Sequence, residues 1–169
     1  MLSVLIETHN HEDALARTLA CLVSGAVEGV VREVIVCDAG SSDRTAIVAE
    51  HAGCHFIGEG GLDAGLRRAR GDWLLLLEPG ARLLDGWMDA VLEHAGEGAA
   101  PAKFRRSAQT RARLVERLFG SGRPLAQGLM ITKHEAQALT KPGSAGDTLA
   151  RQVKARRLDA EIAVAPVSG

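Results

Sequence analysis

Hydrophobic and polar residues along the first hundred positions follow a pattern that predicts strands separated by helices. Four apolar runs are typical of buried strands and span residues 2–6, 33–37, 54–57 and 73–77. The run 73–77 does not alternate with polar residues, so we expect both of its faces to be buried. This order of elements predicts a doubly wound, mostly parallel α/β sheet flanked by helices.

Between these strands, apolar residues recur at helical spacing, which predicts helices. The first helix is expected after Asn10, a candidate cap, and the second over about 44–52, after the candidate caps Ser42 and Asp43. A third helix is expected over about 62–69, and a fourth begins near Trp87. Glycines follow each segment, as they commonly follow helices.

Polar residues follow three of the predicted strands. Thr8 leaves the first strand, Asp38 ends the second, and Glu78 follows the run 73–77. The carboxyl ends of parallel strands share one edge of a sheet, where open α/β folds bind their ligands. A carboxylate there can accept an N–H from a ligand, and turn amides favour phosphate. The alternative for Asp38 is a turn or cap residue.

The second half of the chain is less regular. A basic amphipathic helix is predicted over 104–119 and a strand over 127–132. Further helices are expected over 134–139 and 147–157, and a last strand over 162–164.

Composition places the chain in an ordinary globular class. Its 169 residues, 46% hydrophobic and 24% charged, fit a single domain, in which residues 1–98 and 99–169 form two halves. No apolar run is long enough to span a bilayer and no signal peptide opens the sequence, so we expect a cytoplasmic protein. The three cysteines fit no zinc motif, and we expect them to be reduced.

Charge is distributed unevenly. Residues 1–100 carry 7 basic and 16 acidic side chains, and residues 101–169 carry 13 and 5. The basic half therefore faces an anionic partner or neutralises the acidic half. The segment 103–123 could contact an anionic membrane peripherally, although a solvated helix face is the simpler interpretation. It lacks interleaved aromatic residues, so no nucleic acid partner is expected.

Several segments together resemble the family 2 glycosyltransferases, and most closely the short bacterial members. The first two are residues 3–12 and 33–45, the latter containing Asp38-Ala39-Gly40-Ser41-Ser42-Asp43. Residues 65–73 and 82–87 are similar to the segments around that family's Asp-x-Asp motif. The resemblance is strong over about residues 2–95 and continues more weakly beyond them. It implies the GT-A fold, in which nucleotide-diphospho-sugars bind a Rossmann-like sheet.

The resemblance also implies an activity and its residues. Such an enzyme transfers a sugar from a nucleotide donor, a UDP- or GDP-sugar, to an acceptor with inversion. By position, Thr8, Asn10 and Asp38 would line the nucleotide pocket, and Glu78 would lie near the ribose or hold a metal weakly. Asp147 would be the general base that deprotonates the acceptor hydroxyl. Its alternative role is to complement a helix dipole.

Departures from the family pattern open a second hypothesis. Where the family has Asp-x-Asp, this chain has Glu78-Pro79-Gly80, so glycine replaces the carboxylate that would hold Mn²⁺ or Mg²⁺. Without a metal, a carboxylate about 4 Å from a diphosphate charge repels it by roughly 4 kcal/mol at an effective dielectric of 20. Arginines of the segment 103–123 are the obvious compensation. The alternative function is a catalytically impaired GT-A-like domain, or pseudoenzyme, that binds a nucleotide or a protein partner.

Overall fold

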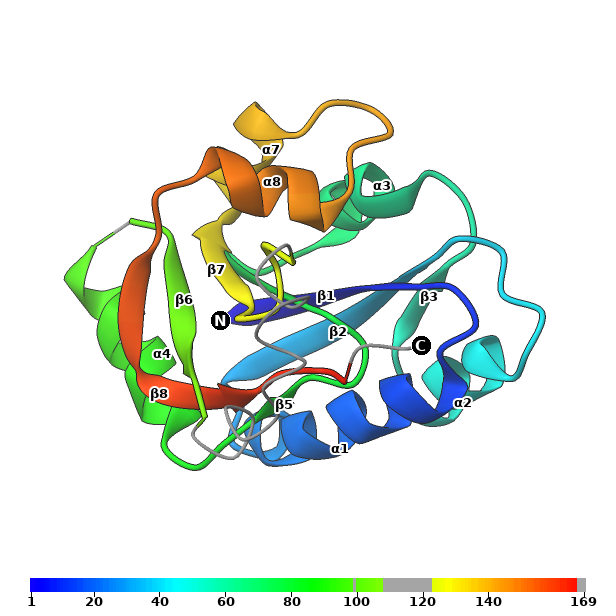
Figure 1. Ribbon diagram of the computed structural model, residues 1–169, viewed down its shortest axis with the longest axis horizontal. Helices are drawn as coiled ribbons and strands as arrows, with labels where there is room; N and C mark the ends of the chain where they lie inside the picture. Colours follow the sequence, from blue (N-terminus) through cyan, green and yellow to red (C-terminus); the bar gives the residue numbers. More distant parts are fainter. Residues whose placement is uncertain (99, 108–122, 167–169) are drawn as a thin grey trace.

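The computed structural model describes residues 1–98, 100–107 and 123–166. Strands from both halves of the chain form one eight-stranded sheet in the order β3-β2-β1-β4-β7-β6-β8-β5 (Figure 1). The strands are β1 (Leu2–Thr8), β2 (Val31–Asp38), β3 (His55–Ile57), β4 (Trp73–Leu77), β5 (Arg82–Leu83), β6 (Ala102–Arg106), β7 (Leu129–Thr132) and β8 (Arg156–Ala163). The described helices are α1 (Glu12–Val27), α2 (Thr45–His51), α3 (Gly61–Arg68), α4 (Trp87–Glu97), α7 (Lys133–Leu139) and α8 (Gly146–Gln152).

The first half of the chain folds as its hydrophobic pattern predicts. Strand β1 pairs in parallel with β2 and β4, and β2 pairs in parallel with β3. The second half adds mixed pairings, because β7 is antiparallel to β4 and β6, whereas β6 and β8 are parallel. The result is the α/β sheet flanked by helices that the sequence predicted, with strands β1 to β4 paired in parallel.

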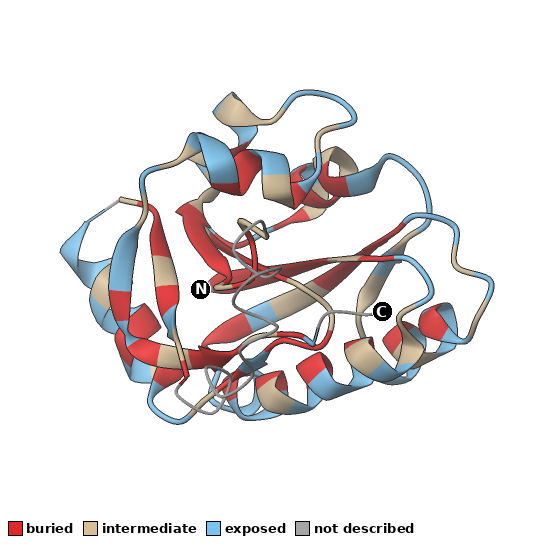
Figure 2. Ribbon diagram, in the orientation of Figure 1, coloured by how far each residue is buried: buried red, intermediate tan, exposed pale blue. Residues whose placement is uncertain are grey.

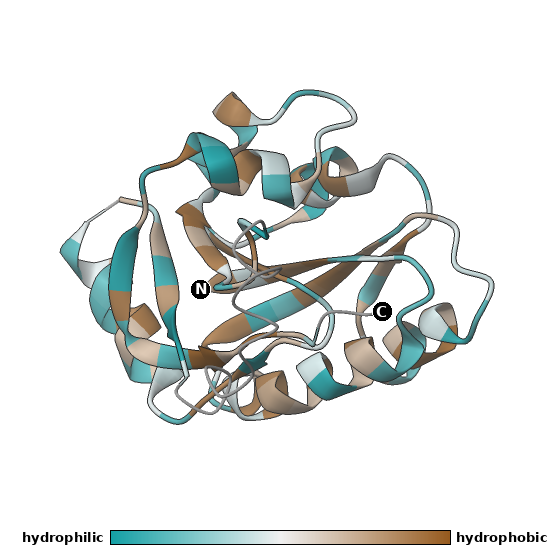
Figure 3. Cartoon of the chain, viewed as in Figure 1, coloured by the Kyte–Doolittle hydropathy of each residue, from teal (hydrophilic) through white to brown (hydrophobic). Residues whose placement is uncertain are grey.

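Two apolar clusters lie on opposite faces of the sheet. Helices α1, α2 and α4 cover one face, and α3, α7 and α8 cover the other (Figure 1). Strand β4 contributes Leu75 and Leu77 to the first cluster and Leu74 and Leu76 to the second. All four are buried, which confirms that this strand has no solvent-facing side. The central strands β1, β4 and β7 are accordingly buried and largely hydrophobic, whereas the outer strands are partly exposed (Figures 2 and 3).

The prediction of a helix over 104–119 is wrong at its start. Residues Ala102–Arg106 form β6, and residues 108–122 lie outside the described part of the chain. Phe104 is fully buried, whereas its neighbours Lys103 and Arg105 are not, so the local period is two rather than 3.6. Pairing with β8, more than fifty residues away, decides between the two structures.

The helix predicted over 147–157 is also too long. Helix α8 ends at Gln152, and strand β8 begins at Arg156 instead of near residue 162. Leu158, Ala160 and Ile162 are buried in alternation, which is the strand signal that the sequence reading missed. The two-residue strand β5, which pairs with β8, was not predicted.

Asn10 does not cap helix α1. His11 occupies the cap position and makes no side-chain capping bond. The Asn10 side chain instead bonds the loop that follows β2, described below. None of the helices in the described ranges is both long and apolar enough to cross a bilayer.

Candidate functional site

The nucleotide-side residues meet where β1 and β2 end. Thr8 and Asp38 are partners in the parallel register of these strands. Both are buried, and the Thr8 hydroxyl donates a hydrogen bond of 2.8 Å to Asp38 Oδ1. The strand register therefore brings two of the four predicted nucleotide-binding residues into contact.

Asp38 organises the loop after β2 as well. Its Oδ2 accepts the amides of Gly40 and Ser41 at 3.0 and 2.7 Å, and Oδ1 also accepts the Ser41 hydroxyl at 2.5 Å. Burial alone would raise the pKa of Asp38, but the bonds from Ser41, Thr8 and Gly40 hold it below its usual value. An ionised carboxylate has about four acceptor positions, so a nucleotide base bonding to Asp38 must displace one of these donors.

Asn10 joins the two loops at this edge. Its backbone has φ of 56°, in the left-handed region that asparagine tolerates better than most residues. The backbone N–H of Asn10 donates to Ser41 Oγ at 2.8 Å. The side-chain Oδ1 of Asn10 accepts the backbone N–H of Ser42 at 2.8 Å. Asp43 Oδ1 in turn accepts the Thr45 amide at 3.0 Å at the start of α2. Asn10 thus holds the loop after β1 against the loop after β2.

Glu78 is held by an arginine from the second half of the chain. The guanidinium of Arg123 bonds both carboxylate oxygens of Glu78, through Nε at 3.3 Å and through Nη2. Arg123 Nη1 also donates to the carbonyl of Ala165 at 3.2 Å. Both side chains are mostly buried, with 26% of Arg123 and 15% of Glu78 exposed. The segment 103–123 therefore supplies the compensating charge expected beside Glu78.

The turn after Glu78 does not offer a metal site. Gly80 has φ of 91°, and a Cβ added there would lie 3.2 Å from the Ala165 Cβ. The Gly80 amide donates to the Ala14 carbonyl at 3.0 Å and to Thr18 Oγ1 at 2.8 Å, which fixes the turn against α1. Among the described residues, no three His, Cys, Asp or Glu side chains gather as a metal site built from protein ligands alone would require. With Glu78 bound by an arginine, the donors present do not fit the divalent cation that the family resemblance implies.

Asp147 reaches the same sheet edge through a neighbouring contact. It lies in the first turn of α8, and its Oδ1 accepts the Leu125 amide at 3.0 Å. The adjacent Gly146 amide donates to Glu7 Oε2 at 2.6 Å, which ties α8 to the end of β1. Burial raises the pKa of Glu7; the Gly146 bond opposes this shift, and the negative charge of Asp147 adds to it. Glu7 thus links β1 to the helix that carries Asp147, a contact that the sequence analysis did not predict.

A cavity of about 380 Å³ lies between the first turns of α1 and the turn after β4. Its lining includes His11, Arg17, Glu78 and Arg123, together with four small or apolar residues. His11, Ala14 and Arg17 are three residues apart along α1 and its start, so they share one helix face. That spacing could have identified Arg17 from the sequence as a residue on the same face as His11. No pattern in adjacent residues could have indicated that Arg123 contacts Glu78.

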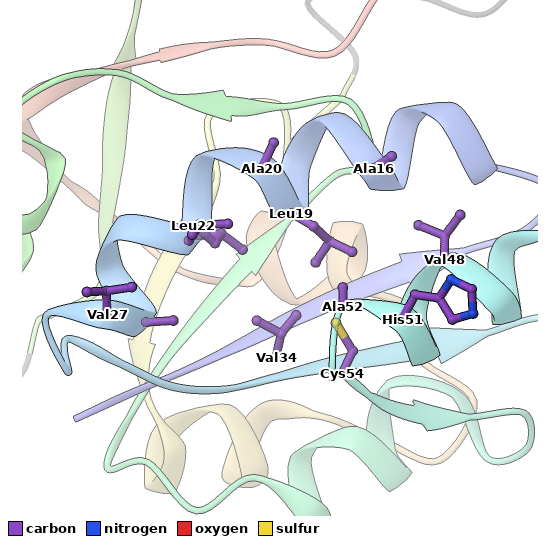
Figure 4. Close-up of a pocket in the computed structure, with 12 residues that line it drawn as sticks. Ala16, Leu19, Ala20, Leu22, Val27, Val34, Val48, His51, Ala52 and Cys54 are labelled. Atoms are coloured by element: carbon purple, nitrogen blue, oxygen red, sulfur yellow. The ribbon is translucent and has the colours of Figure 1, made fainter.

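A larger hollow of about 580 Å³ lies between α1 and α2 (Figure 4). Its lining is apolar apart from His51 and the thiol of Cys54. Burial raises the pKa of that thiol to about 11, which keeps it protonated near neutral pH. This hollow contains no group that would bind a sugar nucleotide.

Comparison with known proteins agrees with the fold. A model of glycosyl transferase family 2 matches residues 3–113. Glucosyl-3-phosphoglycerate synthase from Mycobacterium tuberculosis, in complex with Mn²⁺, UDP and glucosyl-3-phosphoglycerate, has a similar structure. The TM-score is 0.65 at 19% identity, over 100% of this chain and 72% of that one.

Mannosyl-3-phosphoglycerate synthase from Rubrobacter xylanophilus is similar at a TM-score of 0.56 and 19% identity, over 80% of this chain and 54% of that one. At these identities the likeness establishes the GT-A fold. No curated protein matches the chain.

Proposed function

Since this chain belongs to glycosyl transferase family 2, we propose that it transfers a sugar from a UDP- or GDP-sugar to an acceptor hydroxyl with inversion. The single observation that carries this proposal is the hydrogen bond between Glu7 and Gly146. It ties α8, whose first turn carries Asp147, to the end of β1, next to Thr8.

The proposed reaction is a direct displacement at the anomeric carbon. Oδ1 of Asp147 accepts the Leu125 amide, which leaves Oδ2 to take the proton of the acceptor hydroxyl. The acceptor oxygen forms a bond to the anomeric carbon from one face, and the bond to the diphosphate oxygen breaks on the other. Inversion follows because the two oxygens lie on opposite sides of that carbon.

On the donor side, the loops after β1 and β2 would hold the nucleotide. Ser41 is half-buried between the exposed residues Gly40 and Ser42, so its hydroxyl is the donor to Asp38 that a base N–H can replace. Asn10 holds the loop geometry, and Glu78 with Arg123 lies towards the ribose and diphosphate. The similar structures are named as complexes with Mn²⁺, phosphoglyceric acid and either UDP or UDP-glucose, which supports a nucleotide-sugar donor.

A catalytically impaired GT-A-like domain is the second candidate. The observation in its favour is the turn at Gly80, which Ala165 covers and which offers no carboxylate. Donor binding is common to both candidates, and turnover separates them.

Release of UDP or GDP from UDP-glucose, UDP-N-acetylglucosamine and GDP-mannose tests turnover with a pool of sugar and phosphorylated acceptors. We expect Asp147→Asn to lower the rate by roughly 10²- to 10⁴-fold while keeping the nucleotide-induced rise in Tm. A nucleotide at a hundred times its Kd adds about 2.7 kcal/mol of stability, which is several degrees for a chain of this size.

Asp89→Asn is the matched control, because Asp89 is an exposed carboxylate in the first turn of α4, away from this edge. Nucleotide binding without turnover by any donor would favour the impaired domain. A chain that binds no nucleotide would contradict both candidates.

A further inference from the structure

The cavity beside Glu78 is lined by more positive than negative side chains. Two guanidinium groups, Arg17 and Arg123, line it against the single carboxylate of Glu78. Its volume of about 380 Å³ is within the range of small-ligand sites. The cavity therefore suits an anion and does not suit a cation.

The location of the cavity indicates that its anion is a diphosphate. His11, which lines the cavity, follows the loop that the proposed function assigns to the nucleotide. Glu78 and Pro79, which also line it, occupy the start of the turn where the family places its metal-binding carboxylate. A diphosphate bridging nucleoside and sugar would lie between these two points.

Arg123 retains hydrogen-bonding capacity towards this space. Guanidinium has five N–H donors, and the described partners, Glu78 and the Ala165 carbonyl, take three of them. The pair with Glu78 also fixes the plane of the guanidinium, so little conformational freedom is lost when an anion binds. Planar guanidinium groups bind phosphate oxygens in a two-pronged geometry.

We propose that Arg123 and Arg17 bind the diphosphate of the donor in this cavity, in the place where a divalent cation acts in related enzymes. This inference rests on the proposed function and deepens it. In this arrangement Glu78 orients Arg123 and is not a metal ligand. Its own charge opposes the diphosphate, so removing that charge strengthens binding. If Glu78 were a metal ligand, removing its charge would weaken binding of the diphosphate.

Isothermal titration calorimetry of the whole chain with UDP and with inorganic pyrophosphate, in EDTA and in Mn²⁺, tests the proposal. We expect both probes to bind in EDTA with a Kd that Mn²⁺ does not lower. Arg123→Met and Arg17→Met should each raise that Kd roughly tenfold or more, since each removes a charge-assisted contact. Arg17 is exposed, so its substitution tests the cavity without disturbing a buried ion pair.

Glu78→Gln gives the sharpest distinction. It keeps the size and one acceptor oxygen of the side chain and should lower the Kd for pyrophosphate in EDTA by about threefold or more. Arg32→Met is the matched control for total charge, because Arg32 is exposed near the amino end of β2, opposite the site. It should leave both Kd values unchanged.

Three outcomes distinguish failure of this inference from failure of the proposed function. Metal-free binding that weakens without Arg123 supports the inference. Binding of UDP only with Mn²⁺, abolished by Glu78→Gln, overturns the inference and leaves the proposed function standing. Failure of UDP, GDP and pyrophosphate to bind under either condition overturns both.

Discussion

Asp38 offers the clearest test of how the nucleotide edge is built. Its carboxylate accepts four hydrogen bonds, from the Thr8 hydroxyl, the Gly40 amide, and the amide and hydroxyl of Ser41. Asp38→Ala removes all four acceptor positions. Asp38→Asn preserves some of them, because its oxygen can face the two amides while its NH₂ group faces the two hydroxyls, which can rotate to accept.

The magnitude follows from the burial of each donor. The bond from Thr8 is buried, and a buried hydrogen bond to a charged group contributes about 1.5–3 kcal/mol. The other three donors lie on a partly exposed loop, where water replaces the lost acceptor and each bond contributes about 0.5 kcal/mol. We therefore expect Asp38→Ala to lower the free energy of unfolding by about 3–4.5 kcal/mol. Asp38→Asn should lower it by about 1–2 kcal/mol.

The pH dependence of this effect has a fixed sign. The folded pKa of Asp38 lies below the ordinary value of 3.8, so the ionised group stabilises the fold. That contribution is complete above the unfolded pKa and is lost as the pH falls through the folded pKa. The stability difference between the native chain and Asp38→Asn should therefore be constant from about pH 8 to 5 and shrink below about pH 4.

Urea denaturation followed by tryptophan fluorescence measures these differences, since Trp87 is buried and Trp73 half-buried. Asp89→Ala, at an exposed position, controls for loss of a carboxylate. A loss below about 1 kcal/mol in Asp38→Ala at pH 7 would refute the view that Asp38 holds this loop. The same result would leave Asp38 free for a purely ligand-binding role.

Two further predictions concern neighbouring positions. Glu7→Gln should stabilise the chain by about 0.5–1 kcal/mol at pH 8. Because the folded pKa of Glu7 is raised above 4.5, ionised Glu7 destabilises the fold above that pKa, and the gain should vanish near pH 4. Urea denaturation at both pH values checks this, and an equal gain at both would contradict it. Gly80→Asp should cost about 2–3 kcal/mol, through its positive φ and the nearby Ala165, without creating a Mn²⁺ site. Calorimetry with MnCl₂ checks this against Gly80→Asn, and binding specific to the aspartate would contradict the metal-free reading of this turn.

The sequence determined the first half of the fold to a large extent. Strands β1, β2 and β4 are continuous apolar runs that end in polar turns, and each signal lies within about ten residues. Parallel pairing of such strands leaves little freedom in register, because both faces are buried. The contact of Thr8 with Asp38 follows from that register.

The second half needed the tertiary structure. Residues Ala102–Arg106 carry charged and apolar side chains that suit a helix or a strand equally, and pairing with β7 and β8 makes them a strand. Asn10 looked like a helix cap because its side chain satisfies backbone amides at a turn. The amides that it satisfies belong to the neighbouring loop, which no local pattern can indicate.

The site residues show the same difference between local and distant information. The sequence by itself placed Asp38 and Glu78 at strand ends and Asp147 at the start of a helix, because adjacent residues determine strands, turns and caps. Only the tertiary structure decided which charges and surfaces these residues meet. Arg123 binds Glu78 across 45 positions, and Ala165 covers Gly80 from the far end of the chain. Both contacts form because the closing of the sheet brings distant segments to one edge. Those contacts decide whether this edge suits a cation or a diphosphate.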